Sequence, residues 1–141
     1  MTPGAIYRDD AFYVDAQSGA LKAKYFVVLA APPKGDVVIR LLTSQATSRP
    51  EVPACNHGPP YPSYYLGVPG GRLGKKTWID LRTCDDIDPI DATRRMQKAL
   101  LHEGGHLAPA ILRLAMACVA GAQDTTTHQE KLIRDALAAL A

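Results

Sequence analysis

Two apolar runs joined by a very short turn constrain the fold of this chain most. The first run covers residues 24–31 and ends at Pro32-Pro33-Lys34-Gly35, and the second run covers residues 36–42. A continuous apolar run of this length, closed by turn-forming residues, is typical of a buried central strand. Because so short a connection joins neighbouring antiparallel strands, the sequence predicts a β-hairpin at the centre of a sheet.

Shorter β-prone segments surround this hairpin. Residues 6–14 and residues 77–81 combine β-branched and aromatic residues with turn formers at their ends, which favours strands. Between the strands, residues 43–76 are rich in proline and glycine, which excludes a long helix or a central strand. We interpret this segment as a long loop, in which Tyr64-Tyr65-Leu66 could add a short edge strand. Long loops in compact domains are often functional.

The period of the apolar residues changes from two to 3.6 after residue 89. We expect one helix from Asp91 to Gly104-Gly105, a second over about 108–122, and a third after Asp124-Thr125. Helices this short are stable only when they pack against a sheet or a partner. The predicted fold class is therefore α+β, in a single domain over residues 1–141. Its β part covers about 1–88, including the loop 43–76, and its helical part about 91–141.

The charge and the apolar pattern restrict the classes of function. A formal charge of +2 is too small to indicate nucleic-acid binding, so any basic surface must be local. No apolar run reaches the roughly 18 residues that a bilayer span needs, and Met1-Thr2-Pro3-Gly4-Ala5 does not resemble a signal peptide. We therefore expect a cytoplasmic protein without a membrane partner.

The cysteines give no standard pattern. Cys55, Cys84 and Cys118 are odd in number and lie at unrelated spacings, which indicates neither a disulfide framework nor a standard zinc site. We expect reduced thiols and no bound metal. Cys55 and His57 could form half of a metal site if Cys84 and another histidine converged on them, but we do not count these residues as a site.

A competing motif lies at His102-Glu103-Gly104-Gly105-His106, which fits the H-E-x-x-H pattern of zinc hydrolases. That chemistry needs an uninterrupted helix, on which two imidazoles one turn apart bind zinc and the glutamate activates water. Two consecutive glycines and the nearby Pro109 oppose such a helix. A zinc hydrolase is thus a less favoured alternative, and its third ligand would come from Asp124, His128 or Glu130.

Four segments within the first two thirds of the chain resemble the MazF/PemK family of toxin ribonucleases. They are Gly4–Tyr7, Gly19–Leu29, Leu42–Gln45 and Trp78–Thr83. The resemblance implies a small SH3-like antiparallel β-barrel that forms a homodimer and binds single-stranded RNA across the dimer groove. It also implies a toxin-like endoribonuclease that needs no metal or other cofactor, and an antitoxin protein as a possible partner.

The resemblance implies the catalytic residues as well. The family uses an arginine that opens the second strand and a threonine or serine at the end of the next, which correspond here to Lys24 and to Thr43 with Ser44. RNA cleavage through the 2′-hydroxyl needs help with its deprotonation and a fixed cation beside the phosphate. Lysine is a mobile point charge, whereas arginine holds a phosphate through two parallel hydrogen bonds. A catalytically impaired, RNA-binding descendant is therefore part of the hypothesis.

The long loop supplies candidate contacts to RNA. Aromatic rings stack on unpaired bases, cations bind phosphates, and a histidine can transfer protons. The candidates for RNA binding are Arg49, His57, Tyr61, Tyr64 and Arg72. The structural alternative is that the tyrosines and His57 rigidify the loop, that Lys24 is a solvated strand end, and that Thr43 and Ser44 terminate a strand. The functional alternative is a non-catalytic protein-binding module of a toxin-antitoxin or defence system.

Overall fold

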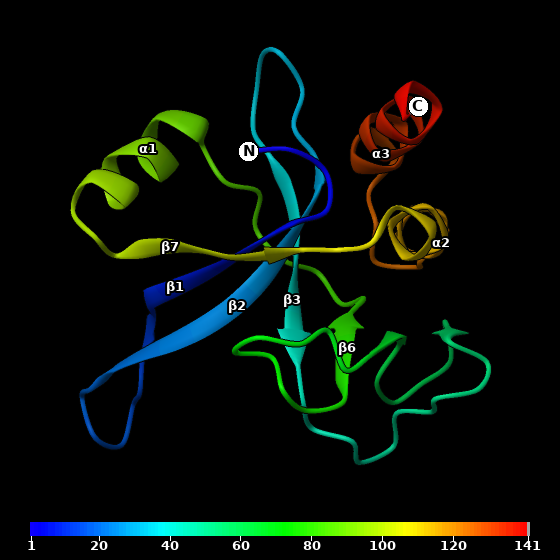
Figure 1. The fold of residues 1–141 in the computed structure, drawn as a ribbon, viewed down its shortest axis with the longest axis horizontal. Coiled ribbons are helices and arrows are strands. Elements are labelled where there is room, and N and C mark those ends of the chain that lie inside the picture. The colour runs from blue at the N-terminus through cyan, green and yellow to red at the C-terminus, as the bar shows by residue number, and fades with distance from the viewer. Residues whose placement is uncertain (141) are drawn as a thin grey trace.

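A computed structural model describes residues 1–140, which form a seven-stranded antiparallel sheet and three helices (Figure 1). The strands are β1 Ala5–Val14, β2 Leu21–Ala30, β3 Val38–Thr43, β4 Cys55–Asn56, β5 Ser63–Gly67, β6 Thr77–Asp80 and β7 Leu101–His106. The helices are α1 Pro89–Gln97, α2 Pro109–Ala120 and α3 Thr127–Ala139. The predicted α+β class is confirmed.

The sheet has the strand order β4-β5-β6-β3-β2-β1-β7. Its two outer strands, β4 and β7, do not pair with each other in the part of the chain described, so the sheet is open. The closed SH3-like barrel is therefore not confirmed.

The predicted central hairpin is confirmed as β2 and β3. These strands pair antiparallel with Phe26 opposite Leu41, Val27 opposite Arg40 and Val28 opposite Ile39. Residues 26–30 are almost fully buried, because one face of the sheet packs against α2 and α3 and the other face covers a smaller core that includes Ala92 of α1. Burial on both faces explains why this strand is a continuous apolar run.

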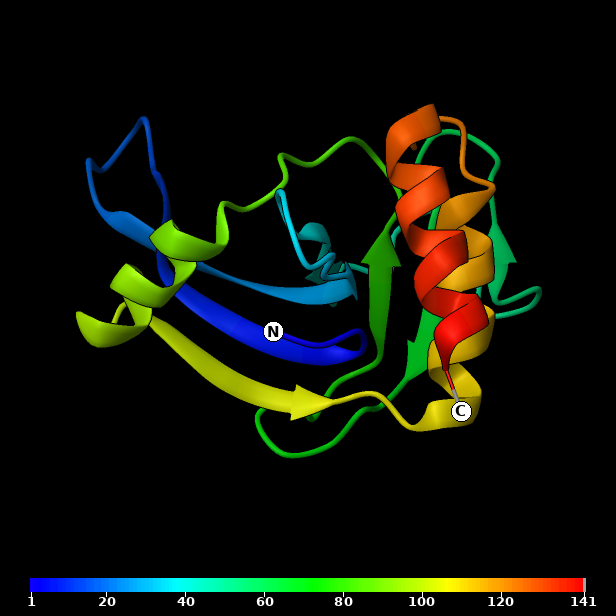
Figure 2. The same ribbon diagram turned by 90° about the horizontal axis from the view of Figure 1, so that it is seen from above.

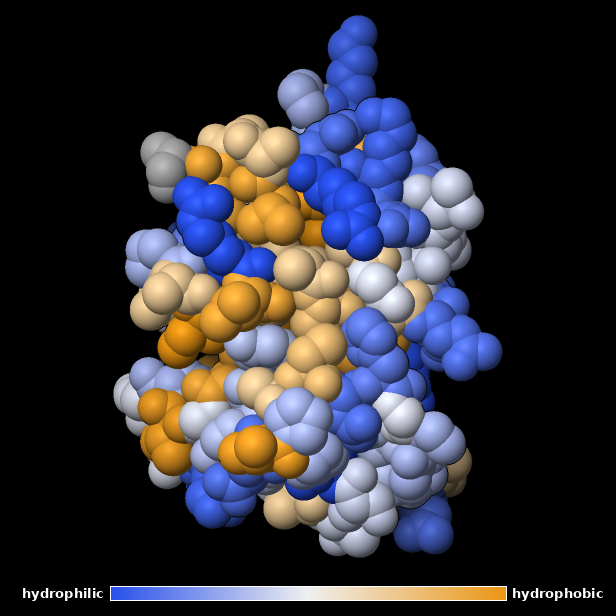
Figure 3. Space-filling model, turned by 90° about the vertical axis from the view of Figure 1, so that its right-hand side faces the viewer, coloured by the Kyte–Doolittle hydropathy of each residue, from blue (hydrophilic) through white to orange (hydrophobic). Residues whose placement is uncertain are grey.

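Helices α2 and α3 lie side by side at one end of the molecule, and α1 lies at the other end of β7 (Figures 1 and 2). The sequence predicts a buried stripe on this helix at Ile111, Leu112, Ala115, Met116 and Val119, and all of these are buried except Ile111, which is half-buried. Some apolar surface remains at this end, as Figure 3 shows, and Leu114 is 63% exposed. No helix among residues 1–140 combines the length and apolar character needed to span a membrane.

A buried polar network fixes α3 to the sheet. The Arg40 guanidinium on β3 is fully buried and donates to Gln129 Oε1 at 3.1 Å and to Thr125 Oγ1 at 3.3 Å. Gln129 in turn donates to Asp86 Oδ1 at 2.9 Å. Burial lowers the pKa of Arg40, although nearby acidic groups oppose the shift. The network therefore aligns the first turn of α3 with β3 and with the segment that follows β6.

The prediction of a helix from Asp91 to Gly104-Gly105 is wrong at both ends. Asp88 is the N-cap and accepts from the Ile90 N–H at 2.9 Å, and α1 ends at Gln97. The chain then forms β7, which pairs with the free edge of β1, and the register shifts opposite Ile6 and Tyr7. The two glycines serve this pairing, because Gly105 has a φ of +127° at the shift and Gly104 packs closely on Ile6.

The long loop contains more regular structure than predicted. Residues 64–66 belong to β5, as expected, but β5 lies between β4 and β6 and is not an edge strand. The edge position is taken by β4, a strand of two residues. A short edge strand suits a proline-rich segment, because proline has no N–H group to donate to a ladder.

Candidate functional site

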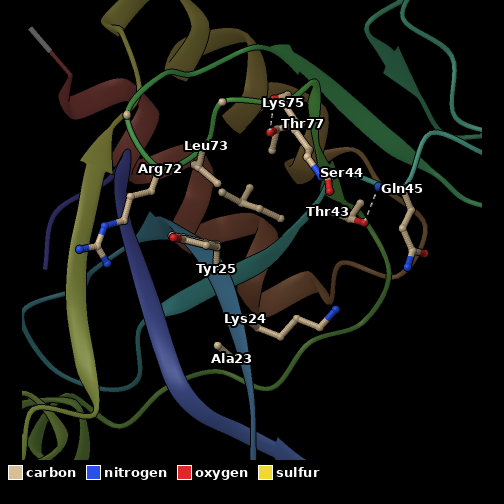
Figure 4. Close-up of a pocket in the computed structure, with 13 residues that line it drawn as sticks. Ala23, Lys24, Tyr25, Thr43, Ser44, Gln45, Arg72, Leu73, Lys75 and Thr77 are labelled. Atoms are coloured by element: carbon tan, nitrogen blue, oxygen red, sulfur yellow. Dashed lines mark hydrogen bonds between the residues drawn. The ribbon is translucent and has the colours of Figure 1, made fainter.

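A pocket of about 620 Å³ lies where β2 and β3 stop pairing (Figure 4). Three cations line it together with several hydroxyl and amide groups, and no carboxylate of the described chain lines it. The polar lining residues are Lys24, Tyr25, Thr43, Ser44, Gln45, Arg72, Lys75 and Thr77. The pocket thus suits an anion that accepts several hydrogen bonds.

The register of the central hairpin places two of these residues together. The ladder between β2 and β3 ends with Phe26 paired to Leu41. Lys24 and Thr43 each lie two residues beyond this last pair on their own strands, and both line the pocket. Figure 4 shows the Lys24 side chain extending toward the side of the pocket that Thr43 and Gln45 form. Lys24 and Thr43 were predicted as site residues, and the fold brings them to one pocket.

The hydroxyl groups of the pocket are held by the backbone. Thr43 Oγ1 accepts from the Gln45 N–H at 3.2 Å, so its own O–H remains able to donate into the pocket. Thr77 Oγ1 donates to the Lys75 carbonyl at 2.9 Å. Ser44 is exposed between these two positions in the lining. Thr43 also pairs with the buried Trp78 of β6, which anchors the end of β3.

A glycine-rich turn supplies the other two cations. Gly70 and Leu73 exchange backbone hydrogen bonds of 3.1 and 3.0 Å, and Gly70 and Gly71 have positive φ, which a glycine adopts without strain. Arg72 lies at this turn, and Figure 4 places it on the other side of Tyr25 from Lys24. Lys75 was missed at the sequence level, although basic residues beside closely spaced glycines are a signal for an anion-binding turn.

Arg49 and Tyr61 do not line the pocket but contact each other. The Arg49 guanidinium lies 4.7 Å from the centre of the Tyr61 ring and donates to the Gln45 carbonyl at 2.8 Å. Arg82 lies 5.3 Å from the same ring and binds Asp80. Burial raises the pKa of Asp80, but the hydrogen bonds from Arg82 outweigh it and leave the pKa below its usual value. Arg49 is 9% exposed, so its main contacts hold the loop that follows Thr43.

The other two residues predicted to bind RNA lie elsewhere. Tyr64 is 6% exposed within the main core, and burial raises its pKa. A ring in this position cannot stack on a base. His57 is exposed but lies beside α2, where its Nε2 is 2.9 Å from the Cys118 carbonyl oxygen. Neither residue lines the pocket that holds Lys24.

The expectation of three reduced thiols is wrong for two of them. Cys55 on β4 and Cys118 on α2 form a disulfide with a Cα–Cα distance of 5.8 Å. The pairing escaped sequence analysis because the two residues are 63 positions apart and meet only through the docking of α2 on the sheet. Cys84 is the one free thiol in the described chain.

The motif of the zinc-hydrolase alternative lies on β7 and not on the helix that its chemistry needs. Positions four apart on a strand are separated by about 13 Å, whereas on a helix they adjoin. His102 Nε2 lies 2.8 Å from Asp10 Oδ2, and His106 Nδ1 lies 2.8 Å from the Leu107 carbonyl oxygen. The two imidazoles therefore have separate partners.

Alkylation of the free thiol should be slow in the folded protein. Burial raises the pKa of Cys84 from 9.0 to about 11, so the reactive thiolate is about 100-fold scarcer at pH 8 than in the unfolded chain. Mass spectrometry of native and urea-unfolded protein treated with iodoacetamide would measure the two rates. The native rate should keep rising with pH up to about 11, and a plateau near pH 9 would contradict the assignment. Because the folded-state pKa is the higher one, ionisation of Cys84 destabilises the fold between these pH values.

The pocket therefore unites Lys24, Thr43, Ser44 and Arg72, which were predicted from sequence, with Lys75, which was not. It offers cations and hydroxyl donors, the groups that bind phosphate. In comparisons with family models, curated proteins and solved structures, the chain gave no match.

Proposed function

We propose that the cationic pocket binds single-stranded RNA and that Lys24, Thr43 and Ser44 form a metal-independent endoribonuclease centre similar to that of the MazF/PemK toxins. One observation carries the proposal: residues from β2, from the end of β3 and from the turn 70–75 line a single pocket with three cations. The adjacent order of β1, β2, β3 and β6 in the sheet supports an SH3-like arrangement that is open at its edges. A homodimer with a shared RNA groove, and an antitoxin that covers the pocket, belong to the same proposal.

In this proposal the 2′-hydroxyl of one nucleotide attacks the adjacent phosphorus. The new P–O2′ bond forms as the P–O5′ bond breaks. Water takes the proton of the 2′-hydroxyl and returns a proton to the departing 5′-oxygen, which leaves a 2′,3′-cyclic phosphate and a 5′-hydroxyl. Lys24 balances the negative charge that builds on the phosphate, and the hydroxyls of Thr43 and Ser44 orient the phosphate or the attacking group. Arg72 and Lys75 bind neighbouring phosphates of the strand and keep it in register.

The test is cleavage of a mixed-sequence single-stranded RNA in EDTA. We expect Lys24→Ala and Thr43→Val each to lower the rate by about 100-fold, the usual effect of losing one group that stabilises the transition state. Lys24→Arg and Thr43→Ser keep the charge and the hydroxyl and should retain cleavage. Lys34→Ala, an exposed lysine in the turn between β2 and β3, is the matched control and should cut at the wild-type rate.

Failure of the wild type to cut at high enzyme excess would reject the nuclease and leave the second candidate, an RNA-binding protein without catalysis. The lysine at position 24, where the toxins carry arginine, favours this candidate. Fluorescence anisotropy with labelled RNA at several salt concentrations distinguishes it. Arg72→Ala and Lys75→Ala should each reduce the slope of log affinity against log salt by about 0.7. If the wild type showed no RNA binding, the pocket would fit the protein-binding alternative better.

A further inference from the structure

A second cluster of reactive side chains lies away from the cationic pocket. Cys55 on β4, His57 directly after it and Cys118 on α2 bring three possible metal ligands within 4.8 Å of one another. His57 Nε2 lies 3.3 Å from Cys55 Sγ and 3.5 Å from Cys118 Sγ. Among residues 1–140, no other group of three or more histidine, cysteine, aspartate or glutamate side chains brings its ligand atoms this close together.

We propose that the reduced form of this cluster binds one Zn²⁺ through Cys55 Sγ, Cys118 Sγ and His57 Nε2. Two thiolates and an imidazole are ligands that zinc prefers, at about 2.3 Å for sulfur and about 2.0–2.1 Å for nitrogen. In a tetrahedral site these bond lengths separate a sulfur from a nitrogen by about 3.5 Å and the two sulfurs by about 3.8 Å. The imidazole nitrogen is already close to this distance from both sulfurs, so zinc binding requires that the sulfurs move apart and that Nε2 releases the Cys118 carbonyl oxygen.

The surroundings of His57 allow this role after one change. Gly121 follows α2, and even a Cβ at this position would lie 3.4 Å from His57 Cε1, an ordinary contact distance, so the ring is not crowded here. Zinc binding requires the tautomer that carries its proton on Nδ1, so His57 Nε2 has to give up its hydrogen bond to the Cys118 carbonyl oxygen. His57 is exposed, so a fourth coordination position is accessible to water or to a further ligand.

The disulfide and the zinc site exclude each other. An external dithiol or phosphine reductant supplies two electrons to the Cys55–Cys118 bond, and two protons complete the pair of thiols. Zn²⁺ then displaces these two protons as it binds the thiolates. In either state the cluster links β4 to α2, but only the oxidised state lacks free ligands. None of these three residues lines the cationic pocket, so the inference does not depend on RNA binding.

The test uses the full chain, reduced with a phosphine and titrated with Co²⁺ and then Zn²⁺ without oxygen. We expect one equivalent of Co²⁺ to give a thiolate charge-transfer band and tetrahedral d–d bands, which one equivalent of Zn²⁺ removes. Cys55→Ser and Cys118→Ser should each weaken the charge-transfer band. His57→Ala should lower the affinity for Zn²⁺ at least about tenfold while keeping both thiolates.

Two matched controls distinguish this site from other ligands. Cys84→Ser removes the free thiol, and His128→Ala removes an exposed histidine on α3, so both should bind Co²⁺ like the wild type. A reduced wild type without a charge-transfer band would overturn the proposal, and so would unchanged affinity in His57→Ala. His57→Ala retains both cysteines, so it can be purified as the disulfide form and reduced afterwards, which separates loss of a ligand from failure to fold.

Discussion

Replacement of Arg95 by methionine is expected to lower the free energy of unfolding by about 3–5 kcal/mol. Arg95 on α1 forms an ion pair with Asp9 on β1, and the Asp9 side chain is 1% exposed. Asp9 Oδ1 also accepts from the Ala11 N–H at 3.0 Å, but Oδ2 has no hydrogen-bond partner among residues 1–140. Without Arg95, the sheet would bury a carboxylate that has lost its ion-pair partner. Urea denaturation followed by circular dichroism measures the loss.

Two further variants show whether the charge is the cause. Arg94→Met changes a neighbouring exposed arginine on α1, and we expect its unfolding free energy to stay within about 0.5 kcal/mol of the wild type. Asp9→Asn combined with Arg95→Met removes both charges and keeps the acceptor for Ala11, so it should recover most of the lost stability. If the double variant were as unstable as Arg95→Met alone, lost packing of the arginine stem, and not an unbalanced charge, would explain the effect.

The elements that sequence analysis located correctly are those with a strong local signal. The β2–β3 hairpin combines continuous apolar runs with a proline-glycine turn, and α2 and α3 carry apolar stripes with the helical period. The start of α3 after Asp124-Thr125 was located correctly, although the capping box of Thr126 and Gln129 that begins this helix was not predicted. These elements depend on residues close together in the chain, so periodicity and turn chemistry are sufficient to predict them.

The features that were missed depend on distant parts of the chain. The segment 101–106 has two glycines and weak alternation, and it becomes a strand because β1 offers a free edge about ninety residues earlier in the chain. The assignment of Gly104-Gly105 as a helix stop failed because glycine equally suits a strand irregularity. Cys55 and Cys118 show the same limit, since only the docking of α2 brings them together.

Part of the candidate site was predictable from the sequence, because it lies at the end of the predicted β2–β3 hairpin. Family resemblance pointed to Lys24 and Thr43, and the antiparallel pairing of β2 with β3 ends two residues before each of them, which brings both to the same pocket. Arg72 came from its place in the long loop. Lys75 lines the pocket with Arg72 because the turn closed by Gly70 and Leu73 brings residues 71–75 to the end of β3. No local sequence pattern gives the direction of that turn.

After the loss of the Arg95–Asp9 ion pair, loss of the Cys55–Cys118 disulfide is expected to lower the stability of the fold most. Cys55→Ala combined with Cys118→Ala should lower the free energy of unfolding by about 4 kcal/mol, because the bond closes a loop of 63 residues and restricts the unfolded chain. It also ties the two-residue strand β4 to α2, and β4 has few other contacts in the sheet. Urea denaturation without reductant measures the loss, and Cys84→Ala is the control that keeps the bond.

Treatment with a reductant distinguishes the stability that comes from the disulfide bond from any effect of replacing the cysteine side chains. Wild-type protein in a phosphine reductant with EDTA should unfold at nearly the urea concentration of the double variant, whereas the double variant should not respond to the reductant. Addition of Zn²⁺ in place of EDTA should restore part of the stability of the reduced wild type, because a ligand that binds the folded state stabilises it. Equal midpoints for oxidised and reduced wild type would show that the bond contributes nothing. A recovery with Zn²⁺ that also occurred in the double variant would place the metal elsewhere.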